Sequence, residues 1–195
     1  MKKTLVLLAI LTLTLWTTSH AIIGIGVRTG LGSYGTSDKD SVKGTSESGL
    51  LFGAHVDFTA LPVIGLEVSA TYWPKSKTVT GPIYTTKTTY SVISLEGTGK
   101  YKFSIPGSPL TPYIGAGPGL YLSKAKVEWT PPPPSPQPAS VEDSETKLGI
   151  HGALGANLKL PTMPVSFGVQ GKYALIFSDP GSHMLSIVGL MTYNF

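Results

Sequence analysis

The sequence contains no cysteine among its 195 residues. This absence excludes disulfide bonds, thiolate catalysis and metal sites built on cysteine, and it leaves no cysteine that a lipid could modify. Charged side chains are also scarce, at 13% of residues, and the formal net charge is only +4. A charge this small does not indicate nucleic-acid binding, so we expect no nucleic acid among the partners.

The sequence has only one long apolar run, Leu5 to Trp16. Two lysines precede the run, and the small-residue segment Ser19-His20-Ala21 follows it. This order is typical of a secretory signal peptide. The run is short for a membrane span and nothing like it recurs, which disfavours a helical membrane protein. We predict a signal peptide over residues 1–21 and one mature domain over residues 22–195.

Glycine (23 residues) and proline (16 residues) are abundant, which favours many short strands separated by turns. Eight segments alternate apolar residues with small, polar or charged ones, as strands with one apolar face do. In order, they are Ile22–Tyr34, Gly49–Thr59, Leu66–Tyr72, Ile93–Phe103, Pro112–Tyr121, Leu148–Lys159, Val165–Phe177 and Met184–Phe195. The connections alternate between long and short, and the last is of medium length. This pattern predicts an all-β fold, an eight-stranded antiparallel up-and-down transmembrane β-barrel, with a soluble barrel of lipocalin type as the alternative.

Two segments resemble a known family. Pro112 to Tyr121 begins with Pro-Tyr, continues with alternate glycines and returns to an aromatic residue, and the chain ends on Tyr193-Asn194-Phe195. These segments resemble the small bacterial outer-membrane β-barrel domain family, which includes OmpA/OmpX-type and OmpW-like proteins. The resemblance implies export through the inner membrane, residence in the outer membrane, and contact with outer-membrane lipids and lipopolysaccharide. It also implies that Tyr193 and Phe195 form an assembly signal for the barrel-assembly machinery.

Pro118 departs from an ideal barrel strand, because proline cannot donate a ladder hydrogen bond and a closed barrel has no free edge. We predict a bulge or a local break at this residue.

The interior of an eight-stranded barrel is filled by side chains, which excludes general diffusion of solutes. The positions expected to face inward carry charges of both signs and two histidines: Arg28, His55, Asp57, Glu67, Glu96, Lys100, His151 and Lys172. Buried charges are tolerated only when they are paired, so we predict a polar network in the lumen. The alternative is a narrow pathway for small solutes through exchanging pairs. The lumen face is polar through most strands, which argues against a pathway for hydrophobic compounds, whereas inward Val188 and Leu190 argue for one.

Two patterns suggest chemistry. His55 and Asp57 share one strand face and could bind a metal ion if His151 approached them, but further ligands are not clustered in the sequence. His183 lies beside serines, as a lipid A modifying enzyme would require, but their spacing differs from the His-x-Ser of the known deacylase. We therefore predict no enzymatic activity, no metal and no cofactor.

The predicted loops carry the remaining signals. Thr130 to Pro138 is proline-rich and cannot be a spanning strand; it favours a stiff polyproline II rod that could dock in an aromatic groove of an extracellular partner. Three acidic residues follow it, up to Glu145. Three lysines in the second predicted loop could bind lipopolysaccharide phosphates, namely Lys75, Lys77 and Lys87. We predict a structural or surface-interaction role through extracellular loops, with transport of a small solute or hydrophobic compound as the alternative.

Overall fold

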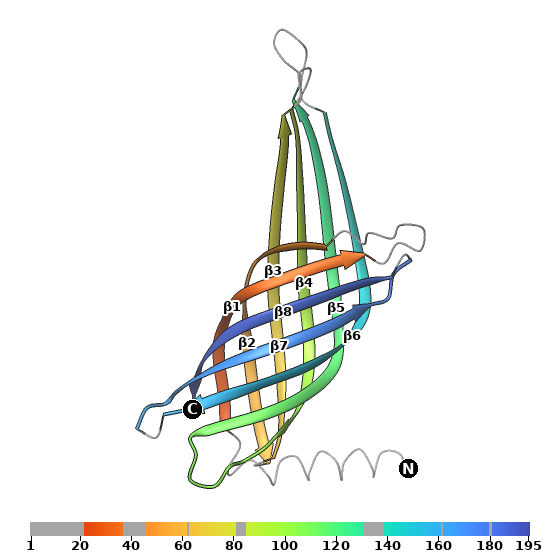
Figure 1. Cartoon of the computed structure of the whole chain (residues 1–195). Coiled ribbons are helices and arrows are strands. Elements are labelled where there is room, and N and C mark those ends of the chain that lie inside the picture. Colours follow the sequence, from red (N-terminus) through yellow and green to blue (C-terminus); the bar gives the residue numbers. More distant parts are fainter. Residues whose placement is uncertain are drawn as a thin grey trace, which may run out of the picture.

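The chain folds into one closed antiparallel barrel (Figure 1). The structure is a computed structural model that describes residues 22–36, 46–61, 63–80, 85–130, 139–160, 162–179 and 181–195. Its strands are β1 (Ile22–Thr36), β2 (Ser46–Leu61), β3 (Ile64–Thr80), β4 (Thr85–Lys102), β5 (Leu110–Thr130), β6 (Ala139–Lys159), β7 (Val165–Ile176) and β8 (Ser182–Asn194). Each strand pairs with its sequence neighbours, and β1 pairs with β8 to close the barrel. The eight-stranded up-and-down fold is confirmed. In the described ranges, no helix has the length and apolar character needed to cross a membrane.

The outer surface of the barrel is apolar and the inner surface is mostly polar, because successive side chains of a strand point to opposite faces. In β8, burial alternates residue by residue over most of the strand. Val27, Leu154 and Ile187 each expose 60% or more of their surface on the outside. A continuous apolar exterior of this size is unfavourable in water and is suited to the hydrocarbon of a membrane.

One end of the barrel, which we call the near end, holds the start of β1 and the end of β8. The Phe195 amide donates to the Ile23 carbonyl oxygen at 2.9 Å and ties the two termini together. Aromatic rings gather at this end in edge-to-face pairs, with centroid distances of 4.9 Å for Tyr193–Phe195 and 5.1 Å for Tyr101–Phe103. Such aromatic girdles are typical of the membrane interface of a barrel.

The turn between β4 and β5 also lies at the near end. Gly107 has a φ of 77°, a conformation that suits glycine, and the Ser108 amide closes the turn by donating to the Ile105 carbonyl at 3.0 Å.

The break predicted at Pro118 is confirmed. The β4–β5 ladder pairs Glu96 with Gly119 and resumes with Gly99 and Ala116, and it omits the pairs between. The β5–β6 ladder continues through Pro118 without interruption. The residue that lacks an amide hydrogen thus interrupts the ladder on one side only, and the register is unchanged beyond it.

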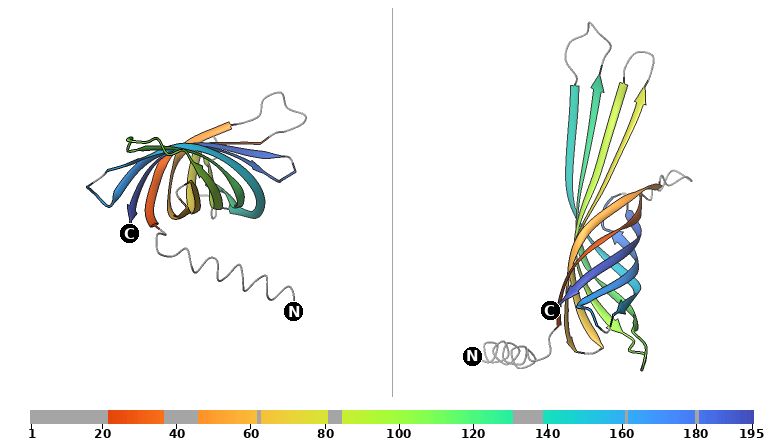
Figure 2. Two further views of the ribbon diagram at one scale, coloured as in Figure 1. Left: turned by 90° about the horizontal axis from the view of Figure 1, so that it is seen from below. Right: turned by 90° about the vertical axis from the view of Figure 1, so that its left-hand side faces the viewer.

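Four strands continue past the barrel at the far end, opposite the near end (Figures 1 and 2). β3 pairs with β2 only as far as Tyr72, and β6 pairs with β7 only from Gly149 onward. Beyond these points the four strands pair only with one another. We call this part the extended sheet; it comprises residues 73–80 of β3, 85–92 of β4, 123–130 of β5 and 139–147 of β6.

The extended sheet corrects part of the predicted loop pattern. Residues from Lys75 to Thr80, and those from Ala139 to Lys147, lie in strands rather than loops. The third connection, predicted to be long, separates only Thr80 from Thr85. The outer face of the extended sheet is polar, and its opposite face mixes polar residues with Val79, Val127 and Val141. Residues 75–80 and 139–147 therefore show little of the apolar alternation that marks a strand in the sequence. The predicted signal peptide, the first loop and the proline-rich residues 131–138 lie outside the described residues.

Candidate functional site: the lumen and the extended sheet

The near half of the lumen holds a buried network of ion pairs. Arg28 Nη2 lies 2.7 Å from Glu67 Oε1, and Lys100 Nζ lies 2.6 Å from Glu67 Oε2. Lys100 also donates to Asp57 Oδ1 at 2.9 Å, and its ammonium stands 4.7 Å from the ring centroid of Tyr113. These side chains come from β1 to β5, so the network joins neighbouring walls across the lumen.

A second pair lies nearer the middle of the barrel. Lys172 Nζ donates to Glu96 Oε2 at 2.5 Å, and the Tyr121 hydroxyl donates to Glu96 Oε1 at 2.8 Å. Together the two groups contain three cations and three anions, so their formal charges balance. Balance and direct pairing are the conditions under which buried charges are tolerated.

The two lumen histidines each contact a threonine. His55 Nε2 lies 2.8 Å from Thr192 Oγ1, and His151 Nε2 lies 2.8 Å from Thr98 Oγ1. His55 Nε2 is also 3.6 Å from Asp57 Oδ2. The structure therefore brings His151 to Thr98 rather than to His55 and Asp57. Among the described residues, no group of three or more metal-ligating side chains comes together.

Glycines on the inner face make room for the rings of the lumen. A Cβ at Gly26 would lie 2.5 Å from the His55 ring, and a Cβ at Gly155 would lie 2.6 Å from the Tyr113 hydroxyl. These distances are too short for real contacts, so the large rings fit only because glycine stands opposite them. Glycine at these two positions thus has a packing role in the lumen.

The far half of the lumen is closed by an apolar cap. Tyr34, Trp73 and Tyr90 are in mutual ring contact, with centroid distances between 5.5 and 6.2 Å. Beneath them lie further buried apolar side chains, namely Leu51, Val92, Tyr121, Ala174, Ile176, Met184, Val188 and Leu190. Of these residues, only Val188 and Leu190 are among the inward residues predicted from the sequence. Alternation alone could have found Trp73, which follows outward Tyr72, but the proline after it marked the start of a predicted loop.

Little space remains between the cap and the polar network. The cavity bounded by Leu51, Glu96, Gln170 and Met184 has a volume of about 10 Å³. This is close to the smallest space that can hold one water molecule. The side chains therefore fill this level of the lumen, and a solute would have to displace them to pass.

The structure does not assemble the histidine–serine cluster considered from the sequence. Ser182 and Ser186 are buried on the inner face of β8, whereas His183 lies on the opposite face. The His183 ring stacks on Tyr173 with a centroid distance of 6.2 Å, and the Ser182 hydroxyl accepts from Ser178. A nucleophile and its general base must be within hydrogen-bond reach, and strand alternation separates these residues.

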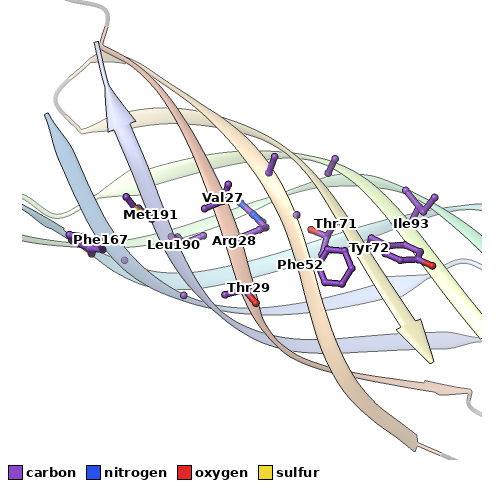
Figure 3. A pocket seen from close by; sticks show the side chains of 15 residues that line it. Val27, Arg28, Thr29, Phe52, Thr71, Tyr72, Ile93, Phe167, Leu190 and Met191 are labelled. Carbon is purple, nitrogen blue, oxygen red and sulfur yellow. The ribbon is translucent and has the colours of Figure 1, made fainter. Parts of the chain in front are cut away.

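A broad depression of about 950 Å³ lies on the outer surface over β7, β8 and β1–β4 (Figure 3). Small outward residues such as Ala54, Ala70 and Gly189 form its floor, and larger residues such as Phe52 and Met191 line it as well. Because it belongs to the apolar exterior, hydrocarbon is the medium that suits it.

The extended sheet differs from the barrel in that its outer face is polar, whereas its opposite face mixes polar side chains with Val79, Val127 and Val141. Residues 140–146 of β6 are exposed, as are Lys87 and Lys124 on the neighbouring strands. Lys126 Nζ lies 2.8 Å from Glu128 Oε1, and the hydrogen bond from Lys126 lowers the pKa of the Glu128 carboxyl. Such exposed ion pairs contribute little to the stability of the fold. The charged side chains on this surface are therefore suited to contact with water.

Comparison with known proteins agrees with this architecture. Residues 4–187 match the family model of the outer membrane protein beta-barrel domain. Neisserial surface protein A is 17% identical, with a TM-score of 0.60, and the match covers 88% of this chain and 97% of that protein. A major outer membrane protein of Thermus thermophilus is 14% identical, with a TM-score of 0.54 and coverage of 90% and 100%. The attachment invasion locus protein Ail of Yersinia pestis is 13% identical, with a TM-score of 0.50 and coverage of 88% and 98%.

These structural similarities show the fold. No curated protein sequence is significantly similar to the chain. The family match covers nearly the whole chain, and the apolar exterior and the closed antiparallel topology agree with it. This protein is therefore an outer-membrane protein and belongs to the outer membrane protein beta-barrel domain family.

Proposed function

We propose that this barrel acts at the cell surface through its extended sheet, as a structural or surface-interaction protein. Outer-membrane barrels turn their short connections to the periplasm and their long hairpins outward. The near end, with Ile23 and Phe195, then faces the periplasm, and the extended sheet stands outside the cell. The observation that supports the proposal most directly is the continuation of β3–β6 past the barrel as a paired, solvent-exposed sheet.

The filled lumen supports surface interaction over transport. An apolar cap on the far side and a charge-balanced network on the near side enclose a cavity of only about 10 Å³. We expect the purified protein to give no current in planar bilayers, and we expect cells with and without it to take up small solutes and hydrophobic compounds equally. Steady single-channel conductance, or faster uptake, would favour the transport alternative.

Removal of the extended sheet tests the proposal. Residues 74–91 and 124–144 would each be replaced by an Asn-Gly turn, which joins the facing pairs Trp73–Val92 and Ser123–Glu145. The barrel keeps all of its wall pairs, so we expect folded protein in the outer membrane at normal levels. Adhesion of intact cells to protein-coated and polysaccharide-coated surfaces, and aggregation of the cells with one another, should fall to the level of cells without the protein.

A second variant controls for the introduction of an Asn-Gly turn. Replacement of Gly107 and Ser108 by Asn-Gly alters a turn at the near end and should leave adhesion and aggregation unchanged. If the shortened barrel is folded and supports both as well as the full chain does, the proposed role of the extended sheet is wrong.

The remaining partners also belong to this proposal. Lipids and lipopolysaccharide would surround the apolar belt, and Lys124 is an exposed cation two residues beyond Leu122 on the outer face of β5. Lys75 donates instead to the Ser48 carbonyl oxygen. The proposed function involves neither catalysis nor a cofactor, so lipid A from cells with and without the protein should carry the same acyl chains. A changed acyl pattern would favour a lipid A modifying enzyme.

A further inference from the structure

We infer that the extended sheet is a docking surface for a second copy of this chain, with the β3 edge of one copy pairing with the β6 edge of the next. The inference names the partner of the proposed surface interaction and rests on the sheet being outside the cell. Three features of the sheet support it: two open edges, their opposite strand directions, and their opposite charges in one register.

Both edges of the extended sheet leave backbone groups unpaired. Residues Trp73–Thr80 of β3 pair only with β4. Residues Ala139–Lys147 of β6 pair only with β5, and the next residue, Leu148, already accepts from Phe177 at 2.8 Å. A row of free amide and carbonyl groups is a template for another strand. The two edges have similar lengths, so each can pair with the other over most of its course; Pro74 has no amide hydrogen and cannot donate to a neighbouring strand.

The membrane restricts how two copies can meet. β3 runs from the near end to the far end, and β6 runs back (Figure 1). Every copy inserted in the same membrane has the same orientation. The β3 edge of one copy and the β6 edge of a neighbour are therefore antiparallel, whereas two β3 edges or two β6 edges are parallel. Antiparallel pairing is slightly more stable for each residue, which favours the unlike edges.

The register set by equal depth in the membrane places opposite charges face to face. Across one extended sheet, Lys75 lies in a row with Tyr90, Ala125 and Asp143, because each is paired with the next. If a neighbouring copy continues the sheet at the same height, its Asp143 stands opposite Lys75. Both side chains lie on the same face, and directly opposed charges of unlike sign stabilise a strand pair.

Like edges lack this complementarity. The β6 edge carries the exposed carboxylates Glu142, Asp143 and Glu145, which two β6 edges would bring together. Among the described residues, Lys147 pairs with Glu145 and Glu142 stands opposite Lys126 of β5, whereas no ion pair within the chain involves Asp143. A lysine on an edge usually discourages pairing. Here its bond to the exposed Ser48 carbonyl can exchange for a bond to the carboxylate of the neighbouring copy.

The absence of cysteine makes cross-linking a sharp test. Thr78 and Ser140 lie in one row, on the face opposite Lys75, and their replacement keeps the charged residues. They are three strands apart within one chain, roughly 14 Å, which is too far for an internal disulfide. The variant Thr78→Cys/Ser140→Cys, purified and inserted in phospholipid vesicles, should form a ladder of covalent dimers and larger oligomers on mild oxidation.

Three controls fix the edges and the register. Thr78→Cys alone and Ser140→Cys alone report pairing of like edges and should stay monomeric. Thr78→Cys/Ser144→Cys keeps the same face but shifts the register by four residues, and it should also stay monomeric. If the ladder fails to form, or if either single variant cross-links as fully as the double variant, the inference is wrong.

Charge reversal tests the proposed contact. In the Thr78→Cys/Ser140→Cys background, Lys75→Glu should lower the cross-linked fraction about fivefold, as the loss of one cross-strand ion pair and its replacement by repulsion would. Adding Asp143→Lys should restore it, because the opposite charges are then exchanged. Cross-linking that is unaffected by Lys75→Glu would overturn the assigned contact.

The outcomes separate this inference from the proposed function. Vesicles contain only this protein, so the cross-linking result does not depend on any extracellular partner. If no ladder forms while removal of the extended sheet still abolishes cell adhesion, the sheet binds a different polypeptide or polysaccharide and self-pairing is wrong. If the ladder forms while that removal changes neither adhesion nor aggregation, the copies pair but the proposed surface role fails.

Discussion

Lys100 Nζ lies 2.6 Å from Glu67 Oε2, and both side chains are fully buried in the lumen. Lys100→Met removes the cation that this carboxylate shares with Asp57. Breaking one partner of a buried pair leaves an uncompensated charge, so the free energy of unfolding should fall by about 3–5 kcal/mol. Urea unfolding of the purified barrel in detergent measures the change. Lys87→Met, an exposed site on the same strand, should change it by less than about 0.5 kcal/mol.

Gly155→Ala should destabilise the barrel by about 1–3 kcal/mol, because the new Cβ would overlap the Tyr113 hydroxyl and the Val169 carbonyl. Gly152→Ala on the same strand is the matched control, since nothing lies within 4 Å of its Cβ position. Thermal unfolding of the two variants measures the difference. Equal unfolding temperatures would show that the lumen glycines are not needed for packing.

Trp73→Ala tests the apolar cap. The side chain is almost fully buried against Tyr34 and Tyr90, so its removal should cost about 3–5 kcal/mol of stability. Planar-bilayer recordings should nevertheless remain without current, because the network around Glu96 and Lys172 lies beneath the cap. Current in the variant but not in the wild type would show that the cap is the main barrier.

Deletion of Phe195 separates assembly from stability. The side chain is 72% exposed and contacts Tyr193, and the residue adds one backbone hydrogen bond, to Ile23, so its loss removes little from the folded barrel. If Tyr193 and Phe195 form the assembly signal, the amount of folded protein in the outer membrane should fall severalfold, while the urea midpoint of barrels that did fold changes little. Phe103→Ala removes a comparable near-end aromatic and should leave assembly normal. Equal insertion of the truncated chain would contradict this prediction.

Much of the barrel could be predicted because residues that face the membrane must be apolar, whereas the alternate residues that face the lumen are mostly polar. Val27 beside Arg28, and Leu95 beside Glu96, show the alternation directly, and the structure places both charged residues inside. The eight predicted network residues all have their side chains in the lumen. Pairing partners were not predictable in the same way, since the contact between Lys172 and Glu96 depends on the curvature that brings β7 opposite β4.

The extended sheet was missed for a physical reason. The residues around Ser76 are mostly serine, threonine and lysine, so they carry no apolar alternation and suit a loop as well as a strand. Their pairing follows from continuation of hairpins that the barrel has already aligned. The aromatic cap was missed with it, because Trp73 lies at the point where barrel and extended sheet meet.

Because β3 and β6 run without interruption from the barrel into the extended sheet, we expect the extended sheet to be rigidly attached to the barrel. No described residue on either strand breaks the backbone pairing where the barrel ends, at Tyr72 and Gly149. A pull on the outer part of the sheet therefore passes along the strands and loads their hydrogen bonds with β2 and β7 in shear, many at once. A force applied to the extended sheet would therefore be transmitted through the barrel wall to the outer membrane, without a flexible linker between them.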